Sequence, residues 1–371
     1  MSLIYIIIFI TLGLTILIGS HLLLYFSLVN FFSINSFALK SSLIWLILFL
    51  SISFILASFL VFLKDNIFTR GFYLFSGFWT GLFLNLLMAA FFTWIIIGAS
   101  RFLSVNLNIS ILALILILVA FGYSIYGVWN ARHPKIKNIS VTIPNLPEEW
   151  KDKKIVQLSD IHIGHINRKK FVERVLGKVN SVNPEMVVIT GDMFDMEDGD
   201  LDSPVTLING INSPKGVFFI TGNHETYLGL NKVEKDIAKT KAVFVHDQVI
   251  DIDGLKLIGI DYPNRMEKKD IVAVLDSLKS DFLGKPNILL YHAPTNIEQI
   301  KEAGVNLELC GHTHKGQLFP LKYIVNLIYK GYGYGLHQFG DYTLYVSSGT
   351  GSWGPPMRTG SDSEIVVITL N

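Results

Sequence analysis

The segment KIVQLSDIHIG, residues 154–164, decides the fold of the second half of this chain. Its first five residues, Lys154–Leu158, form a short, mostly apolar run with two β-branched residues, which predicts a buried strand. Asp160 and His162 follow directly after that strand. Because ligands bind at the carboxyl ends of strands in α/β sheets, this segment predicts a functional site at that edge of the sheet.

The same arrangement recurs four times further along the chain. Carboxylate, imidazole or amide side chains directly follow a strand pattern in Gly191-Asp192-Met193-Phe194-Asp195, Gly222-Asn223-His224-Glu225, Tyr291-His292 and Gly311-His312-Thr313-His314. Each motif alone could be an ordinary turn, because Gly and Asn both tolerate positive φ. Five such motifs in one chain indicate instead that separate strands aim their ligands at one point.

Short apolar runs alternate with helical patterns throughout this half, which predicts an α/β domain. The expected strands are Lys154–Leu158, Met186–Thr190, Val217–Thr221, Lys256–Ile260, Asn287–Tyr291, Leu307–Leu309, Thr343–Ser347 and Glu364–Leu370, and the expected helices are Lys169–Asn180, Lys232–Lys239, Lys269–Leu278 and Thr295–Ala303. The sequence contains no GxGxxG or GxxxxGK[ST] loop, so nucleotide cradles of those kinds are excluded. It also contains no Gly-x-Ser-x-Gly nucleophile elbow.

The first 130 residues have a different composition. They contain four Lys or Arg residues and one acid, whereas the remaining 27 basic and 29 acidic residues all follow Asn130. A membrane helix needs about 20 mostly apolar residues, and four stretches qualify: Leu3–Phe26, Ser42–Leu63, Phe72–Ile97 and Ile109–Trp129. Buried helices of a soluble core are the alternative, but none of the stretches shows the polar face that such a helix turns to water. We expect the polar residues His21 and Asn85 to form helix–helix hydrogen bonds rather than to mark a transport path.

The sequence therefore predicts a transmembrane helical domain over residues 1–130, a linker over 131–150 and a catalytic domain over 151–371. Loop charges predict the orientation: with four spans, five positive residues share the side of the catalytic domain (Lys64, Arg70, Arg132, Lys135, Lys137), against two on the other side (Lys40, Arg101). The positive-inside rule then places the catalytic domain in the cytoplasm. The second half carries a small net negative charge, so we expect no nucleic-acid partner. The only cysteine is Cys310, which excludes an intrachain disulfide and a Cys-rich zinc module.

The five motifs, in their order along the chain, resemble those of the calcineurin-like metallophosphoesterase superfamily. The tail, with Ser348-Gly349-Thr350-Gly351 and Pro355-Pro356-Met357-Arg358, resembles a membrane-associated bacterial branch that includes UDP-2,3-diacylglucosamine pyrophosphatase-like enzymes. Lys315 departs from that branch, which commonly has a glycine there. The resemblance covers most of the second half and none of the four spans. It implies a four-layer α-β-β-α sandwich.

The resemblance also implies two divalent metal sites. The first would use Asp160, His162 and His314, the second Asn223, His292 and His312, and Asp192 would bridge the two. Mixed imidazole and carboxylate ligands suit Mn²⁺, Fe or Zn²⁺ better than Mg²⁺. Two such ions activate water as hydroxide and clamp an in-line displacement at phosphorus.

The remaining site residues have expected roles beside the metals. By the same resemblance, His224 would either protonate the leaving oxygen or stabilise the transition-state charge. Asp195 would orient and charge that imidazole. Arg358 and Lys315 are candidates for contact with substrate phosphate, with plain solvent exposure as the alternative.

The expected function is a membrane-anchored phosphohydrolase in a bacterial cell membrane. It would cleave a phosphodiester or pyrophosphate bond, and the bilayer and a lipid-linked substrate such as UDP-2,3-diacylglucosamine are its expected partners. The apolar segment 321–339 has two interpretations. It is either a core helix followed by a hairpin, or an interfacial segment that dips into the lipid headgroups and lines an acyl pocket. The alternative function is a membrane receptor or transporter regulated by an attached phosphoesterase domain.

Overall fold

The computed structural model describes residues 3–195, 205–264 and 269–371. The chain forms two compact units. The first comprises residues 1–128 together with Gly354–Met357, and the second comprises Trp129–Trp353 together with Arg358–Asn371.

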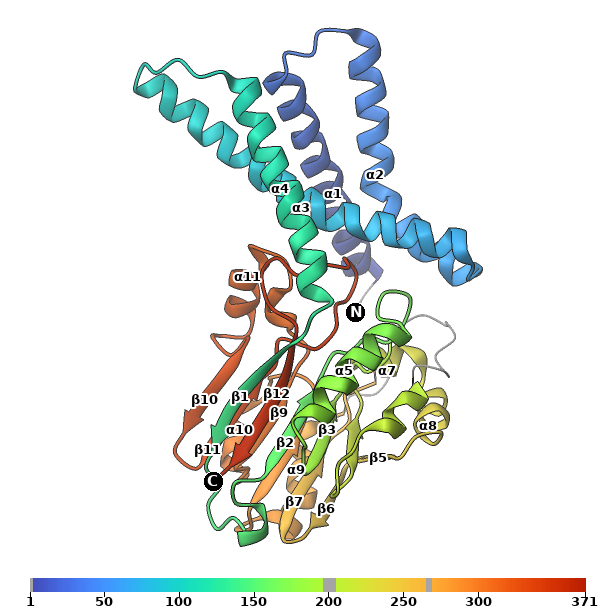
Figure 1. Cartoon of the computed structure of the whole chain (residues 1–371), viewed down its shortest axis with the longest axis vertical. Coiled ribbons are helices and arrows are strands. Elements are labelled where there is room, and N and C mark those ends of the chain that lie inside the picture. Colours follow the sequence, from blue (N-terminus) through green and yellow to red (C-terminus); the bar gives the residue numbers. More distant parts are fainter. Residues whose placement is uncertain (1–2, 196–204, 265–268) are drawn as a thin grey trace. The chain divides into compact units, whose positions relative to one another are not determined.

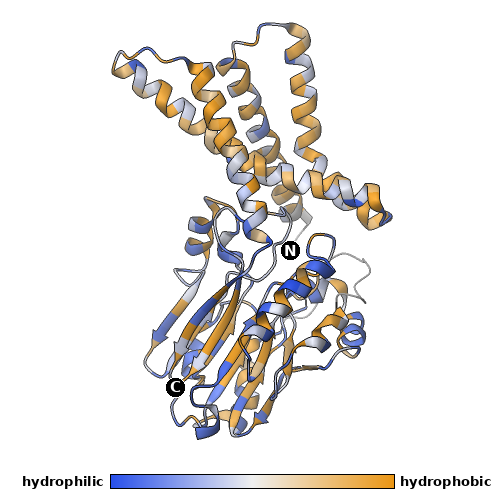
Figure 2. Ribbon diagram, viewed as in Figure 1, coloured by the Kyte–Doolittle hydropathy of each residue, from blue (hydrophilic) through white to orange (hydrophobic). Residues whose placement is uncertain are grey.

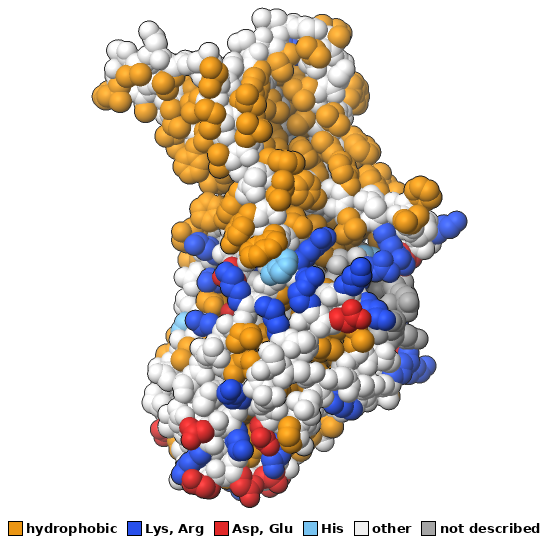
Figure 3. Space-filling model, viewed as in Figure 1, with side chains coloured by type: hydrophobic (Ala, Val, Ile, Leu, Met, Phe, Trp, Pro, Cys, Tyr) orange, Lys and Arg blue, Asp and Glu red, His pale blue; other side chains and the backbone are white. Residues whose placement is uncertain are grey.

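The first unit is built from four long helices within the described residues: α1 (Leu3–Phe31), α2 (Phe37–Leu63), α3 (Ile67–Phe102) and α4 (Ile109–Ala131). All four are long and apolar enough to cross a membrane, and their surface is largely hydrophobic (Figures 2 and 3). The four predicted spans are therefore confirmed, although three of the helices extend several residues beyond the apolar cores from which they were predicted. Polar caps explain part of this extension: Ser36 caps α2, and Asn66 forms a capping box with Thr69 at the start of α3.

Polar side chains inside this unit link its helices. Asn85 Nδ2 in α3 donates to Ser124 Oγ in α4 over 2.8 Å, and Trp79 Nε1 in α3 donates to His21 Nε2 in α1 over 3.3 Å. Both predicted polar intrusions thus form helix–helix hydrogen bonds, as expected.

Two six-stranded sheets form the centre of the second unit as far as it is described, with strand orders β1-β12-β2-β3-β4-β5 and β10-β11-β9-β8-β7-β6 (Figure 1). The strands are β1 (Lys135–Val141), β2 (Lys154–Leu158), β3 (Met186–Thr190), β4 (Val217–Ile220), β5 (Ala242–Phe244), β6 (Gln248–Ile252), β7 (Leu255–Gly259), β8 (Asn287–Leu290), β9 (Leu307–Cys310), β10 (Gly335–Phe339), β11 (Tyr342–Val346) and β12 (Glu364–Leu370). The helices are α5 (Lys169–Ser181), α7 (Asn223–Leu228), α8 (Leu230–Ile237), α9 (Ile271–Phe282), α10 (Ile297–Glu302) and α11 (Leu321–Ile328).

Three buried clusters define four layers. One cluster joins the inner faces of the two sheets, with Val188 of β3 and Leu290 of β8 among its members. A second packs α5 and α8 on the outer face of the first sheet, and a third packs α9 and α10 on the outer face of the second. Both faces of the central strands are buried, so the sequences of these strands are mostly apolar. The expected α-β-β-α sandwich is confirmed.

The expected linker over 131–150 differs from the structure. Residues 135–141 form β1, which pairs in parallel with β12 from Lys135↔Glu364 to Val141↔Leu370. Most of β1 is exposed because it is the edge strand, so its sequence lacks the apolar run of a central strand. Only residues 132–134 separate α4 from β1.

Candidate metal centre

Loops that follow strands of both sheets bring the expected ligands together. Asp160 and His162 follow β2, Asp192 follows β3, His292 follows β8, and His312 and His314 follow β9. The ligand atoms of Asp160, His162 and His314 lie within 4.8 Å of one another, and so do those of Asp192, His292 and His312. These are the two groups that the sequence assigned to separate ions, except for Asn223.

Asp192 lies between the two groups. Its Oδ2 is 3.1 Å from His292 Nε2 and 3.9 Å from His162 Nε2. His162 Nε2 is in turn 3.1 Å from His314 Nε2, which is 3.4 Å from Asp160 Oδ1. This carboxylate is therefore placed where a bridging ligand would be needed.

Asn223 is the remaining expected ligand. It is the first residue of α7, and its side-chain oxygen is buried without a hydrogen-bond partner in the described part of the chain. Buried polar oxygens are nearly always paired, so this one fits a metal ligand. The residues present thus suit a pair of divalent ions with mixed nitrogen and oxygen ligands.

The backbone of this centre is held in an uncommon conformation. Positive φ angles of 49° to 71° occur at five of the expected ligands, which are Asp160, His162, Asp192, His312 and His314. Non-glycine residues rarely adopt such angles, and each costs free energy that the surrounding fold must offset. Their concentration at one point indicates a functional site.

Two glycines allow the loops to approach one another. A Cβ at Gly222 would lie 2.2 Å from Asp192 Oδ1, and a Cβ at Gly311 would lie 2.2 Å from Asp160 Oδ2. Both distances are far below van der Waals contact. The glycine that opens each of these motifs is therefore required by close packing against a ligand carboxylate.

Burial keeps most of the imidazoles neutral, which is the form that binds metal. It lowers the pKa of His162 to about 3 and that of His312 to about 4, and it lowers the pKa of His314 well below its usual value. His292 differs: burial alone would lower its pKa, but the charge and hydrogen bond of Asp192 raise it to about 10.

Neighbouring groups orient the ligands. His292 Nδ1 lies 2.8 Å from the carbonyl oxygen of Thr190, which as an acceptor requires Nδ1–H and leaves Nε2 facing Asp192. Glu225, for which no role was predicted, accepts three backbone N–H groups, from Asp192 (2.8 Å), Phe194 (3.0 Å) and Gly222 (2.7 Å). It therefore ties the loops after β3 and β4 together behind the ligands.

The expected acid–His pair is also formed. His224 Nδ1 lies 3.5 Å from Asp195 Oδ1. Burial would lower the pKa of His224, but Asp195 and Asp192 together raise it, which favours the protonated ring. The rings of Trp353 and Tyr227 each lie with their centroids 5.7 Å from that of His224. Gln317 fixes Trp353 by hydrogen bonds to its backbone N–H and carbonyl.

Arg358 does not face solvent and is not open to a substrate. It is fully buried, and its guanidinium donates to Gly351 O, His314 O, Ser361 Oγ and Asp362 O, and also lies 3.0 Å from His314 Nδ1. Its donors are already used by the protein, so the geometry replaces the expected phosphate contact with a role in positioning His314.

Lys315 is half-buried, and its Nζ lies 3.8 Å from the centroid of the Tyr334 ring. Its φ of +50° lies in the left-handed region, which glycine adopts more readily than lysine. Its ammonium group is thus engaged with an aromatic ring, and contact with a phosphate stays a prediction.

A further His/Asp group shares no residue with the centre. His246, Asp247 and Asp261 have ligand atoms within 4.8 Å of one another. The Lys269 ammonium lies 2.6 Å from Asp247 Oδ1, so a cation already pairs with one of its two carboxylates. No motif surrounds His246 in the sequence, and this group adds no ligand to the centre.

Known proteins are similar to this chain in sequence. Residues 153–316 match the family model of the calcineurin-like phosphoesterases. An uncharacterised metallophosphoesterase of Campylobacter jejuni is 36% identical over 270 residues, which is 71% of each chain. A second, from Helicobacter pylori, is 34% identical over 257 residues, which is 68% of each chain. A transmembrane protein with metallophosphoesterase domain from Danio rerio is 32% identical over 284 residues, which is 70% of this chain and 62% of that one.

Proposed function

This chain belongs to the calcineurin-like metallophosphoesterase family, and from that membership we propose that it is a two-metal hydrolase of phosphodiester or pyrophosphate bonds. It is a metal-dependent phosphoesterase and, with four apolar helices, a membrane protein. The observation that carries the two-metal proposal is the position of Asp192, whose Oδ2 lies between one group of ligands and the other.

The chain's own residues would divide the work as follows. Asp160, His162 and His314 would hold one ion, Asn223, His292 and His312 the other, and Asp192 both. When bound, the ions would supply Lewis acidity at phosphorus and hydroxide from water near neutral pH. His224, kept protonated by Asp195, would donate a proton to the leaving oxygen. The nitrogen and oxygen ligands favour Mn²⁺, Fe or Zn²⁺ over Mg²⁺.

We further propose that the substrate is linked to a lipid. The spans hold the catalytic unit at a bilayer, and the ring of Tyr329 connects the centre to a pocket with an apolar wall. UDP-2,3-diacylglucosamine is one substrate of this class. The charges that flank the spans support a cytoplasmic catalytic unit. The similar proteins of Campylobacter jejuni and Helicobacter pylori support a bacterial membrane.

A regulatory role for the phosphoesterase in a receptor or transporter is the alternative. In the described part of the helical unit, His21 and Asn85 both have hydrogen-bond partners on other helices. Buried polar groups paired in this way stabilise helix packing, so the structure offers no specific support for a transport path.

The His224→Ala variant tests the mechanism. We expect it to bind metal as the wild type does but to lower kcat by about 10²- to 10⁴-fold on a diester with an alkyl leaving group. A p-nitrophenyl leaving group needs no proton, so the loss there should be much smaller.

The matched control is His246→Ala, because His246 belongs to the same unit but pairs with Asp261 outside the centre. We expect the control to keep full activity on both substrates. Equal losses for the two leaving groups in His224→Ala would reject proton donation by His224. Failure of the wild type to bind divalent metal would reject the two-metal proposal itself.

A further inference from the structure

Helix α11 exposes an apolar face. None of its eight described residues is buried, and Tyr323, Ile324, Leu327 and Ile328 are all largely exposed, with Leu327 at 80%. Tyr323 and Leu327 are four residues apart, as are Ile324 and Ile328, so each pair lies on one side of the helix. A contiguous apolar patch of this kind marks an interaction surface.

The charges around α11 indicate what covers this face. From Lys315 to Gly340 the sequence has three lysines and no acid. Lys322 Nζ lies 5.0 Å from the Tyr323 ring centroid, and Lys330 follows the end of the helix. Apolar side chains bordered by lysines and tyrosines are typical of helices that lie in the headgroup region of an anionic bilayer.

The covalent tether favours lipid over a protein partner. Residues 132–134 alone connect α4 to β1, and three extended residues reach about 10 Å. The catalytic unit therefore never diffuses away from the bilayer surface, and a weak interfacial contact gains from this high effective concentration.

We propose that α11 lies in the membrane interface, with Tyr323, Ile324, Leu327 and Ile328 among the lipid chains and headgroups, and with Lys322 facing anionic lipid. The contact with lipid does not depend on the proposed function.

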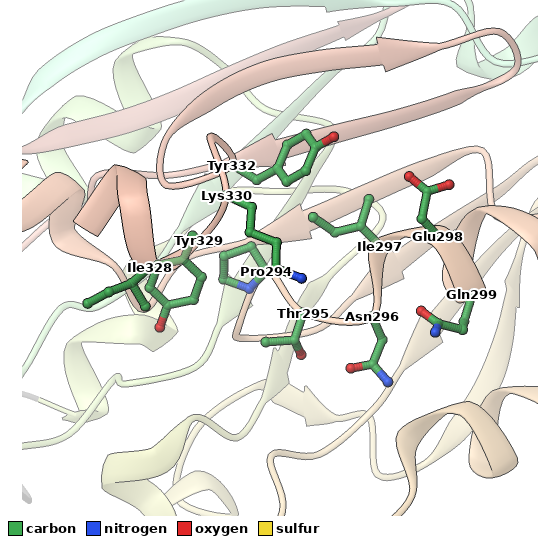
Figure 4. A pocket seen from close by; sticks show the side chains of 10 residues that line it. All are labelled: Pro294, Thr295, Asn296, Ile297, Glu298, Gln299, Ile328, Tyr329, Lys330 and Tyr332. Carbon is green, nitrogen blue, oxygen red and sulfur yellow. The ribbon is translucent and has the colours of Figure 1, made fainter. Parts of the chain in front are cut away.

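The same helix leads toward the metal centre. Its end forms one wall of a pocket of about 760 Å³, in which Ile328, Tyr329 and Lys330 face the segment from Pro294 to Gln299 (Figure 4). The ring centroid of Tyr329 is 6.2 Å from that of His312. A lipid held at α11 would thus enter this pocket beside the ligands, and this second step rests on the proposed phosphohydrolase activity.

Site-specific fluorescence tests the contact. Cys310 is the only cysteine and is fully buried, so Leu327→Cys can be labelled alone with an environment-sensitive dye. The full chain is placed in nanodiscs of phosphatidylcholine and phosphatidylglycerol that hold one copy each. Spin-labelled lipid should quench the dye at position 327.

Leu283→Cys is the matched control, because Leu283 is also an exposed leucine, at 53%, but follows α9. We expect its dye to stay unquenched. Equal quenching at both positions, or none at 327, overturns the proposal; a contact between two copies would give no lipid quenching in single-copy discs.

A charge substitution provides a second readout. With the dye at Ile324→Cys, adding Leu327→Glu should abolish the quenching, since a carboxylate is repelled by anionic headgroups. Leu327 is too exposed for this change to disturb the fold. Unchanged quenching in Leu327→Glu also overturns the proposal. Hydrolysis of a soluble ester by the same variant should match that by the wild type. This measurement distinguishes a failure of the proposed phosphohydrolase activity from a failure of the proposed lipid contact.

Discussion

Removal of the Glu225 carboxylate should loosen the metal centre without removing a ligand. In Glu225→Ala, the N–H groups of Asp192, Phe194 and Gly222 lose their acceptor inside the protein. A buried donor without a partner costs about 1–3 kcal/mol, so three cost about 3–9 kcal/mol at most. In Glu225→Gln, one oxygen can still serve Asp192 and Gly222 while the amide faces Phe194, which leaves a cost of about 1–3 kcal/mol.

The assay is denaturant unfolding of the full chain in detergent with a chelator, followed by calorimetric titration with Mn²⁺. We expect stability to fall from wild type to Gln to Ala. Metal affinity should fall in the same order, because Glu225 holds the backbone of the bridging Asp192. Glu308→Ala is the matched control: Glu308 is equally buried, but it accepts from Tyr342 and Cys310 on the second sheet.

The control should lose stability and keep its metal affinity. If Glu225→Ala bound Mn²⁺ as tightly as the wild type, the proposed link between this carboxylate and the ligands would be refuted. If it were also as stable as the wild type, the three hydrogen bonds would have no energetic importance.

Three further outcomes are expected. Gly311→Ala should abolish metal binding, measured by calorimetry, because its Cβ would lie 2.2 Å from Asp160 Oδ2; retained affinity would contradict the close packing. Burial raises the pKa of Glu308 from 4.5 to about 7. The protonated carboxyl therefore stabilises the folded protein fully below pH 4.5, and this contribution of about 3 kcal/mol is lost as the pH rises through 7. The free energy of unfolding of Glu308→Gln, measured at several pH values, should not show that loss. A pH profile identical to that of the wild type would refute the prediction. Arg358→Lys should lower both stability and metal affinity, because an ammonium cannot replace the forked donors that reach several carbonyls; a merely structural role would leave metal affinity unchanged.

The sequence predicted best the strands that are buried on both faces. Strands β2, β3 and β12 were predicted to the residue because two packed faces leave a mostly apolar run. Strands β5 and β6 were not predicted, since each is an edge strand with exposed or half-buried residues. Tertiary pairing rather than local pattern defines such strands.

In the metal centre too, residues in local motifs were predicted, whereas roles that depend on tertiary contacts were not. The ligands were predicted because each lies in a motif directly after a strand, as with Asp192 and His292. The part played by Glu225 was not, because its partners are backbone N–H groups on separate loops. The position of Trp353 against His224 follows from hydrogen bonds to Gln317, which no local signal reveals. A sequence also does not show that the donors of Arg358 are already occupied.

The strand order of the first sheet has a consequence for biosynthesis. Strand β12 lies between β1 and β2, although more than 200 residues separate it from either in the chain. A ribosome that has not yet released residues 364–370 therefore carries a nascent chain in which β1 has no partner. The helices can insert into the bilayer during translation, but the catalytic unit must wait for its last strand, and we infer that this interval is when chaperones would be needed most.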